Sequence, residues 1–239
     1  AIYGKGNAAM LDRFGILYYT GEDYDLHYPG YGDSWPALNG AVGMTYEKAG
    51  GGRAGLAVRF KGRGYDLTLR DRVRHHFLTG IATLKTAVET KEARLRDYYR
   101  FRILAIEAGR SGRVKSYILL PGRDPGRAAQ LISLLMDQGI EVSRASGSFK
   151  VKRAHGYYGE ALEREFEAGS YIVGLAQPAG LLAKSLLELE SPVKDLFFYD
   201  VTAWTLPLAY GVEGYWTEEL LDLPSELLSS KPVVKGGVK

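Results

Sequence analysis

The sequence predicts a mixed α/β protein whose second half forms a small doubly wound α/β domain. Two long segments, 68–88 and 91–108, place apolar residues at the spacing of an α-helix. Beyond residue 112 the pattern changes to short apolar strands that alternate with apolar helices. This alternation is typical of α/β domains, in which helices cover the faces of a sheet.

The first part of the chain predicts an irregular region with one short helix and one strand. Residues 7–19 carry apolar side chains at helical spacing. Prolines, glycines and tyrosines crowd residues 24–36 and predict a structured loop. Small and apolar residues over 40–47 predict a buried strand that ends on Glu47, and the glycines at 50–52 interrupt it.

Two helices are expected next. Thr68, with Asp71 three residues later, forms a near capping box at the start of the first helix. One apolar stripe follows this helix and consists of Leu69, Val73, Phe77, Ile81, Leu84 and Val88. The second helix is expected to bury a face made of Leu95, Tyr98, Phe101 and Leu104. Residues 109–112 are expected to form a linker.

The second half reads as strand, helix, strand, then strand and helix. After a buried strand at 117–120, Asp124 is a good N-cap and Pro125 a good first helical residue. The inner face of this helix is expected to hold Ala128, Leu131, Ile132 and Leu135, with Gly139 ending it. The remaining elements are strands at 140–142 and 170–175 and a helix at 179–189. This order predicts a doubly wound, flavodoxin-like sheet. We therefore expect two domains, 1–112 and 113–239.

Composition excludes several classes of function. The 31 basic and 28 acidic side chains give a net charge of only +3, which provides no electrostatic case for nucleic acid. No apolar run approaches the roughly 20 residues that a membrane span needs, so no membrane partner is expected. Without cysteine, disulfides, thiol nucleophiles and cysteine-ligated metals are excluded. The first residues lack the apolar core of a signal peptide. The chain starts at Ala rather than Met, as expected for a processed or excised piece of a longer protein.

Glu47 is the first candidate for a catalytic residue. A carboxylate at the end of a strand, facing a loop rich in Tyr, Gly and Pro, is a suitable general base. It could take a proton from a metal-bound water and later protonate a leaving amine. The alternative is an acid at a strand end that makes an ordinary salt bridge, and spacing alone favours this alternative.

Two motifs carry a resemblance to a known family. The segment from Tyr28 to Trp35 reads YPGYGDSW, and the segment from Gly40 to Glu47 reads GAVGMTYE. Together they resemble the end of the catalytic domain in carboxypeptidase A-like zinc carboxypeptidases, where a strand ends in Thr-aromatic-Glu. The helix with His75 and His76, and the trailing segment 199–207, look like bacterial members of that family. The resemblance covers most of the chain, and only the stretch 28–47 is specific.

The resemblance implies roles for four residues. Glu47 would be the general base of a peptidase that hydrolyses C-terminal peptide bonds. Tyr28, or as second choice Tyr31, would be the mobile tyrosine that closes over the substrate. Asp33 would lie in the side-chain pocket and select a basic C-terminal residue. For Asp33 the alternative is a side chain that bonds its own backbone and fixes a turn.

The sequence departs from this family in its metal site. The family binds zinc through a His-x-x-Glu pair and a later His, all upstream of the general base, and no His-x-x-Glu occurs here. We therefore expect zinc in a longer parent protein and no metal in this chain, which should be inactive alone. Its partners would be the upstream half of the catalytic domain and a peptide substrate. The parent is expected to be secreted or periplasmic.

The second domain also has two interpretations. Large bacterial zinc carboxypeptidases place a domain similar to class I glutamine amidotransferases after the peptidase, so 113–239 resembles such an appendage. It has no cysteine nucleophile, and we expect it to be non-catalytic. Alternatively, the whole chain is a non-catalytic two-domain module that binds a peptide or glycan through the tyrosine-rich loop.

Overall fold

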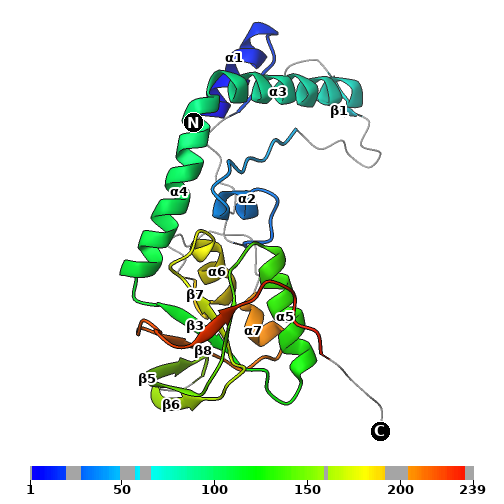
Figure 1. Cartoon of the computed structure of the whole chain (residues 1–239). Coiled ribbons are helices and arrows are strands. Elements are labelled where there is room, and N and C mark those ends of the chain that lie inside the picture. Colours follow the sequence, from blue (N-terminus) through cyan, green and yellow to red (C-terminus); the bar gives the residue numbers. More distant parts are fainter. Residues whose placement is uncertain are drawn as a thin grey trace. The chain divides into compact units, whose positions relative to one another are not determined.

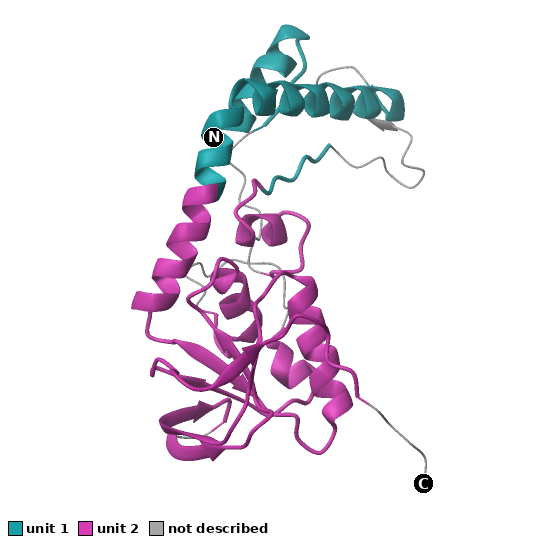
Figure 2. Ribbon diagram, viewed as in Figure 1, with its two compact units in different colours: residues 1–24, 43–98 teal, residues 25–42, 99–239 magenta. Residues whose placement is uncertain are grey.

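The computed structural model describes residues 2–19, 28–48, 57–59, 66–158, 161–191 and 204–234. They form a mixed α/β protein, as the sequence predicts (Figure 1). The chain divides into two units, one of residues 1–24 and 43–98 and the other of 25–42 and 99–239 (Figure 2). The chain therefore passes between the units three times, whereas the sequence suggested one boundary near 112.

The first unit consists of helices and one short β-ribbon. Its elements are α1 (Ile2–Arg13), β1 (Ala57–Arg59), β2 (Asp66–Thr68), α3 (Leu69–Glu89) and the start of α4 (Lys91–Ser111). Strands β1 and β2 pair antiparallel, with Val58 opposite Leu67. The predicted capping box at the start of α3 is confirmed: the Thr68 hydroxyl accepts from the Asp71 amide, and the Asp71 carboxylate accepts from the Thr68 amide at 3.0 Å. Helix α1 begins and ends earlier than the predicted helix over 7–19.

Small residues bring α1 and α3 close together. Thr79, Ala82 and Thr86 are the buried residues of α3. A Cβ built on Gly6 of α1 would lie 2.1 Å from the Thr86 hydroxyl oxygen, so the two helices meet at a point that admits no side chain. The Thr83 hydroxyl also donates to the side-chain oxygen of Asn7 at 3.4 Å.

The predicted apolar stripe of α3 is exposed. Its side chains are between 42% and 76% exposed; they are Leu69, Val73, Phe77, Ile81, Leu84 and Val88. On α4 the expected buried face is also wrong for three of its four members, since Leu95, Tyr98 and Leu104 are exposed. Amphipathic spacing predicts a helix with an apolar face, but burial of that face also requires a packing partner. Within the described residues of each unit, no element covers these side chains.

The second unit is a seven-stranded sheet with helices. Its elements are α2 (Ser34–Leu38), the end of α4, β3 (Ser116–Leu119), α5 (Pro125–Asp137), β4 (Ser143–Ala145), β5 (Phe149–Gly156), β6 (Leu162–Phe166), β7 (Tyr171–Gly174), α6 (Gly180–Leu187), α7 (Leu206–Ala209), β8 (Gly214–Thr217) and β9 (Ser225–Leu227). The strands lie in the order β6-β5-β8-β3-β7-β4-β9.

The sheet is antiparallel, which corrects the doubly wound, flavodoxin-like prediction. Strand β3 pairs antiparallel with β7 and β8, and β4 pairs antiparallel with β7. The connections β3-α5-β4 and β7-α6-α7-β8 therefore each join two parallel strands that are separated by one antiparallel strand. The central order β8-β3-β7-β4 with these connections is a split β-α-β, or ferredoxin-like, arrangement. The doubly wound prediction is wrong because the order strand, helix, strand, strand, helix is that of the split arrangement, whereas a doubly wound sheet alternates strands with helices throughout.

Both helices of the split arrangement pack on one face of the sheet. Tyr117 and Leu119 of β3 belong to the same buried cluster as the inner residues of α5 and α6. Ile118, between them in β3, points to the other face and packs under the β5-β6 hairpin with Val151, Ala154 and Phe166. The sheet thus has two cores, a large one under the helices and a small one under the hairpin.

Helix α5 agrees closely with its prediction. The Asp124 carboxylate accepts from the amides of Gly126 and Arg127, at 3.1 and 3.3 Å, and Pro125 opens the helix. The predicted inner face, Ala128, Leu131, Ile132 and Leu135, is at most 1% exposed. Gly139 after the helix has a φ of 74°, the left-handed conformation that favours glycine.

Other predicted elements need correction. Residues 42–48 form no strand, because no described strand pairs with them. The strand expected at 140–142 is displaced to β4, although Ile140 and Val142 are buried as expected. Gly109 is not part of a linker, since it lies inside α4 and is buried.

Two glycines allow two helices to approach one carbonyl group. A Cβ on Gly109 of α4, or on Gly180 of α6, would lie 2.0 Å from the backbone oxygen of Leu175, just after β7. Backbone on both sides leaves no room for adjustment. Among the described residues, no helix is long and apolar enough to cross a membrane.

Candidate functional site

Tyr28 and Tyr31 lie in an aromatic cluster of the second unit. The two rings meet edge to face with centroids 5.2 Å apart, and Tyr28 also contacts the ring of Trp204 at 5.8 Å. Both tyrosines are half-buried. A Cβ on Gly30 would lie 2.6 Å from the Tyr28 ring, so a glycine at this position lets the tyrosine fold back over its own loop.

Asp33 is the N-cap of the short helix α2. Its carboxylate accepts a hydrogen bond from the Ser34 amide at 2.9 Å. The next residue, Trp35, is 43% exposed, and its indole N–H donates to the Gln138 side chain at 2.8 Å. Gln138 follows the last turn of α5, so this bond holds α2 against the end of that helix.

Arg102 holds the other end of the same loop. Its guanidinium donates to the carbonyl oxygens of Asn39 and Pro178, each at 3.0 Å. Gly40 has a φ of 80°, and a Cβ there would lie 2.6 Å from the Phe101 ring. The segment 28–40 is therefore bound to the rest of the second unit at several points along its length.

Glu47 belongs to the first unit, whereas Tyr28, Tyr31 and Asp33 belong to the second. Its side chain is exposed, but its neighbours are held in place. The Tyr46 hydroxyl shares a hydrogen bond of 2.5 Å with the Thr83 hydroxyl of α3. The Lys48 ammonium donates to the Leu17 carbonyl at 3.3 Å. Glu47 is thus an exposed carboxylate on an anchored segment.

The described residues do not form a zinc site. No group of three or more His, Asp or Glu side chains is placed to hold a metal ion in the part of the chain that the structure describes. His75 and His76 are adjacent on α3, so their side chains leave the helix about 100° apart and cannot share one ion.

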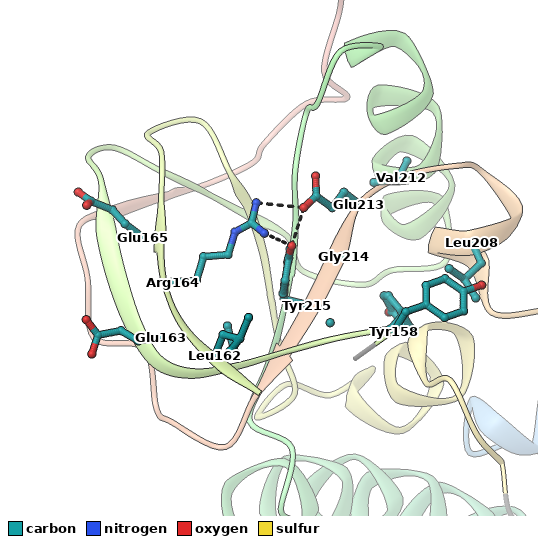
Figure 3. Close-up of a pocket in the computed structure, with 13 residues that line it drawn as sticks. Tyr158, Leu162, Glu163, Arg164, Glu165, Leu208, Val212, Glu213, Gly214 and Tyr215 are labelled. Carbon is teal, nitrogen blue, oxygen red and sulfur yellow. Dashed lines mark hydrogen bonds and ion pairs between the residues drawn. The ribbon is translucent and has the colours of Figure 1, made fainter. Parts of the chain in front are cut away.

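The sequence did not indicate a pocket that lies beside β6, β5 and β8 (Figure 3). Its volume is about 590 Å³. Arg164 reaches from β6 toward Glu213 and Tyr215, and its guanidinium lies 3.0 Å from the Glu213 carboxylate. The guanidinium also donates to the Tyr215 hydroxyl, which in turn donates to Glu213 at 2.5 Å. The segment LEREF that forms β6 has three consecutive charged residues between Leu162 and Phe166, so it lacks the alternation of apolar and polar residues that predicts a strand.

Burial and the contact with Glu213 raise the pKa of Tyr215 and keep the phenol neutral, although Arg164 acts in the opposite direction. Burial raises the pKa of the Tyr215 phenol above its ordinary value of 10.0, and the hydrogen bond to Glu213 raises it further. The phenol therefore remains a donor at physiological pH. Glu213 accepts the hydrogen bond from the Tyr215 hydroxyl and forms its ion pair with Arg164 through a single oxygen, Oε1.

Comparison of the chain with protein-family models, with curated proteins and with solved structures found no match.

Proposed function

We propose that residues 1–112 are the C-terminal portion of a zinc carboxypeptidase catalytic domain, with Glu47 as its general base. The observation that carries this proposal is the exposed Glu47 carboxylate between two anchored neighbours. A general base must reach its substrate and yet keep its position. The Tyr46–Thr83 and Lys48–Leu17 hydrogen bonds provide the position, and the exposure of Glu47 leaves the carboxylate accessible.

The exposed stripe of α3 supports a larger parent domain. Contiguous apolar surface on a protein marks a site of contact. The stripe extends over the full length of a 21-residue helix. In the proposed parent, the upstream half of the catalytic domain would cover it and would also supply the zinc ligands.

The chemistry assigned to this chain is proton transfer by Glu47. As a water oxygen bonds to the peptide carbonyl carbon, Glu47 accepts the proton that the water loses. When the C–N bond breaks, the same carboxyl group returns that proton to the leaving amine. Tyr28, or else Tyr31, would donate a hydrogen bond at the substrate end. Asp33 would face the side chain of a basic C-terminal residue, as an acid that a substrate cation neutralises.

A comparison of two variants of the full-length parent tests this proposal. Glu47→Gln should reduce hydrolysis of C-terminal residues by about 10²–10⁴-fold, the usual contribution of a general base, while the zinc content stays unchanged. Glu92→Gln is the control, because Glu92 is also an exposed acid of the first unit, and its ion pair with Arg96 is long, at 3.9 Å. Near-normal turnover in Glu47→Gln would show that Glu47 is not the general base.

The proposal treats residues 113–239 as a non-catalytic domain. Its antiparallel sheet differs from the doubly wound sheet of amidotransferase domains, so an amidotransferase-like origin is not part of the proposal. The proposal also includes a secreted or periplasmic location for the parent protein. If the parent binds peptides or glycans but hydrolyses none of them, the chain is instead part of a two-domain binding module.

A further inference from the structure

Arg164 lies on the apolar face of the β5-β6 hairpin. It pairs with Val151, which is fully buried, and is two residues from Phe166, which is 1% exposed. Its guanidinium carbon lies 4.3 Å from the centre of the Tyr215 ring. A charge on such a face is costly unless it is compensated, and Glu213 and Tyr215 compensate it.

The compensated pair remains accessible. The side chains of Arg164 and Glu213 are 38% and 53% exposed. The bonds from Arg164 and Tyr215 to Glu213 both end on Oε1, and Oε2 has no protein partner among the residues that the structure describes. Each terminal guanidinium nitrogen of Arg164 carries two N–H groups and uses one of them. The pair therefore offers an acceptor and donors side by side.

Apolar and aromatic residues, together with Glu163 and Glu165, line the rest of the pocket. Tyr158, Leu162 and Leu208 are 81%, 67% and 36% exposed at its edge. In Figure 3, Tyr158 and Leu208 lie on the far side of the pocket from Arg164, and Glu163 and Glu165 point away from it. The hydroxyl of a third tyrosine, Tyr157, is occupied, because it donates to the Leu187 carbonyl at 2.5 Å.

These groups select the chemistry of a ligand. An anionic ligand would bring its charge next to Glu213, and a cationic ligand next to Arg164. A purely apolar ligand would remove water from both charges and replace none of the lost hydrogen bonds. A neutral ligand with adjacent hydroxyl groups satisfies both, because a hydroxyl donates to a carboxylate and accepts from a guanidinium.

We propose that this pocket binds a saccharide. Two adjacent hydroxyls of one sugar ring bridge Glu213 Oε2 and the free N–H groups of Arg164. The C–H face of the same or the next ring lies on the exposed ring of Tyr158, whose face carries partial negative charge. The inference is separate from the role proposed for Glu47, and concerns residues of the second unit alone.

Binding of soluble oligosaccharides to the full chain tests this proposal. The probes are hexasaccharides of β-1,4-glucose, β-1,4-N-acetylglucosamine and α-1,6-mannose, observed by saturation-transfer NMR and titrated for affinity. We expect at least one to bind. Tyr158→Ala should then weaken binding by about tenfold, a loss typical of one aromatic stacking contact. Tyr99→Ala is the control, since Tyr99 is 68% exposed on α4 and does not line the pocket.

Glu213→Ala gives a second test, in which thermal unfolding checks that the variant remains folded. Binding should fall below detection, since the hydroxyl acceptor is lost. Failure of all three saccharides to bind overturns the proposal, and so does equal binding by wild type and Tyr158→Ala. Preferential binding of inorganic phosphate or of a hexalysine peptide, measured in parallel, overturns it as well.

Discussion

The imidazole of His155 lies flat against the indole of Trp216, with ring centroids 3.7 Å apart and planes 7° from parallel. His155 is in β5 and Trp216 is opposite it in β8. The Arg113 guanidinium carbon lies 5.2 Å from the centre of the same indole ring, and Arg113 also forms an ion pair of 2.6 Å with Glu218. The histidine side chain is only 13% exposed, so its protonation is coupled to folding.

The first prediction concerns pH. Burial lowers the pKa of His155 below its ordinary value of 6.5, and nearby Arg153 and Arg113 lower it further, while Glu218 opposes them. The unfolded chain therefore binds the proton more readily than the folded chain. The stability contributed by neutral His155 is full above pH 6.5 and is lost as pH falls through the lower folded pKa.

Thermal unfolding of wild type and His155→Phe, compared between about pH 5 and pH 8, measures this contribution. Phenylalanine keeps the ring contact and cannot titrate. The difference in stability between the two proteins should shift in favour of the variant as pH decreases. Burial also lowers the pKa of His75. Because His75 is present in both proteins, its effect cancels in the difference between them. A difference that does not change with pH would contradict the prediction.

The second prediction concerns the contact between α1 and α3. Gly6→Ala should destabilise the protein by about 1–3 kcal/mol, the usual cost of overpacking. The new Cβ would displace the Thr86 hydroxyl, which donates to the Ala82 carbonyl at 2.8 Å. Gly4→Ala is a matched control in the same helix, with no atom within 4 Å of its added Cβ. It should stabilise by roughly 0.5–1 kcal/mol through helix propensity. Chemical unfolding of both variants checks the opposite signs.

The third prediction concerns the approach of α4 to Leu175. Gly109→Ala places a Cβ 2.0 Å from a backbone oxygen, and backbone cannot turn aside as a side chain can. The cost should exceed about 3 kcal/mol, at the upper end for point substitutions. Gly80→Ala, in the middle of α3 with open space around it, should be neutral or stabilising. Equal unfolding midpoints for the two variants would show that α4 does not pack as described.

The fourth prediction separates two roles of Asp33. Asparagine is as good an N-cap as aspartate, so Asp33→Asn should keep α2 intact, whereas Asp33→Ala should cost about 0.5–2 kcal/mol. Loosening of α2 is measured by the fluorescence of Trp35, which lies in that helix. In the full-length parent, peptides ending in Arg or Phe test specificity. The proposed pocket role requires Asp33→Asn to lose its preference for Arg. If that preference is unchanged, Asp33 acts only as a cap.

Local signals predicted the helices α3, α4, α5 and α6, whereas α2 and α7 were missed and α1 was expected several residues later. The cap at Asp124, the proline at 125 and the buried face of α5 all depend on residues within one helix. The same holds for the capping box of Thr68 and Asp71. The spacing of the stripe on α3 correctly indicated a helix, but its burial depends on what lies beside the helix, which spacing does not specify.

Long-range pairing was beyond the sequence patterns. Strand direction in the sheet depends on which strands become neighbours, and β5, β6 and β8 were not recognised as strands. Arg164 and Glu213 are far apart in the chain and meet only because β6 and β8 both lie beside β5. Tyr28, Tyr31 and Asp33 were correctly placed together in a loop, since they are close in sequence. Their relation to Glu47 was inferred from its place after this loop in the sequence and from family resemblance.

The split arrangement of the sheet also has a consequence during protein synthesis. Strand β3 is central, but Ser116 pairs with Gly174 and with Thr217, which follow it by 58 and 101 residues. At about 5–20 residues per second, a ribosome completes the second partner roughly 5–20 s after β3. During that time Tyr117, Ile118 and Leu119 have no complete set of neighbours in the nascent chain. Pairing of β3 on both edges is therefore completed only after β8 has been translated, and until then its apolar side chains are open to binding by a chaperone.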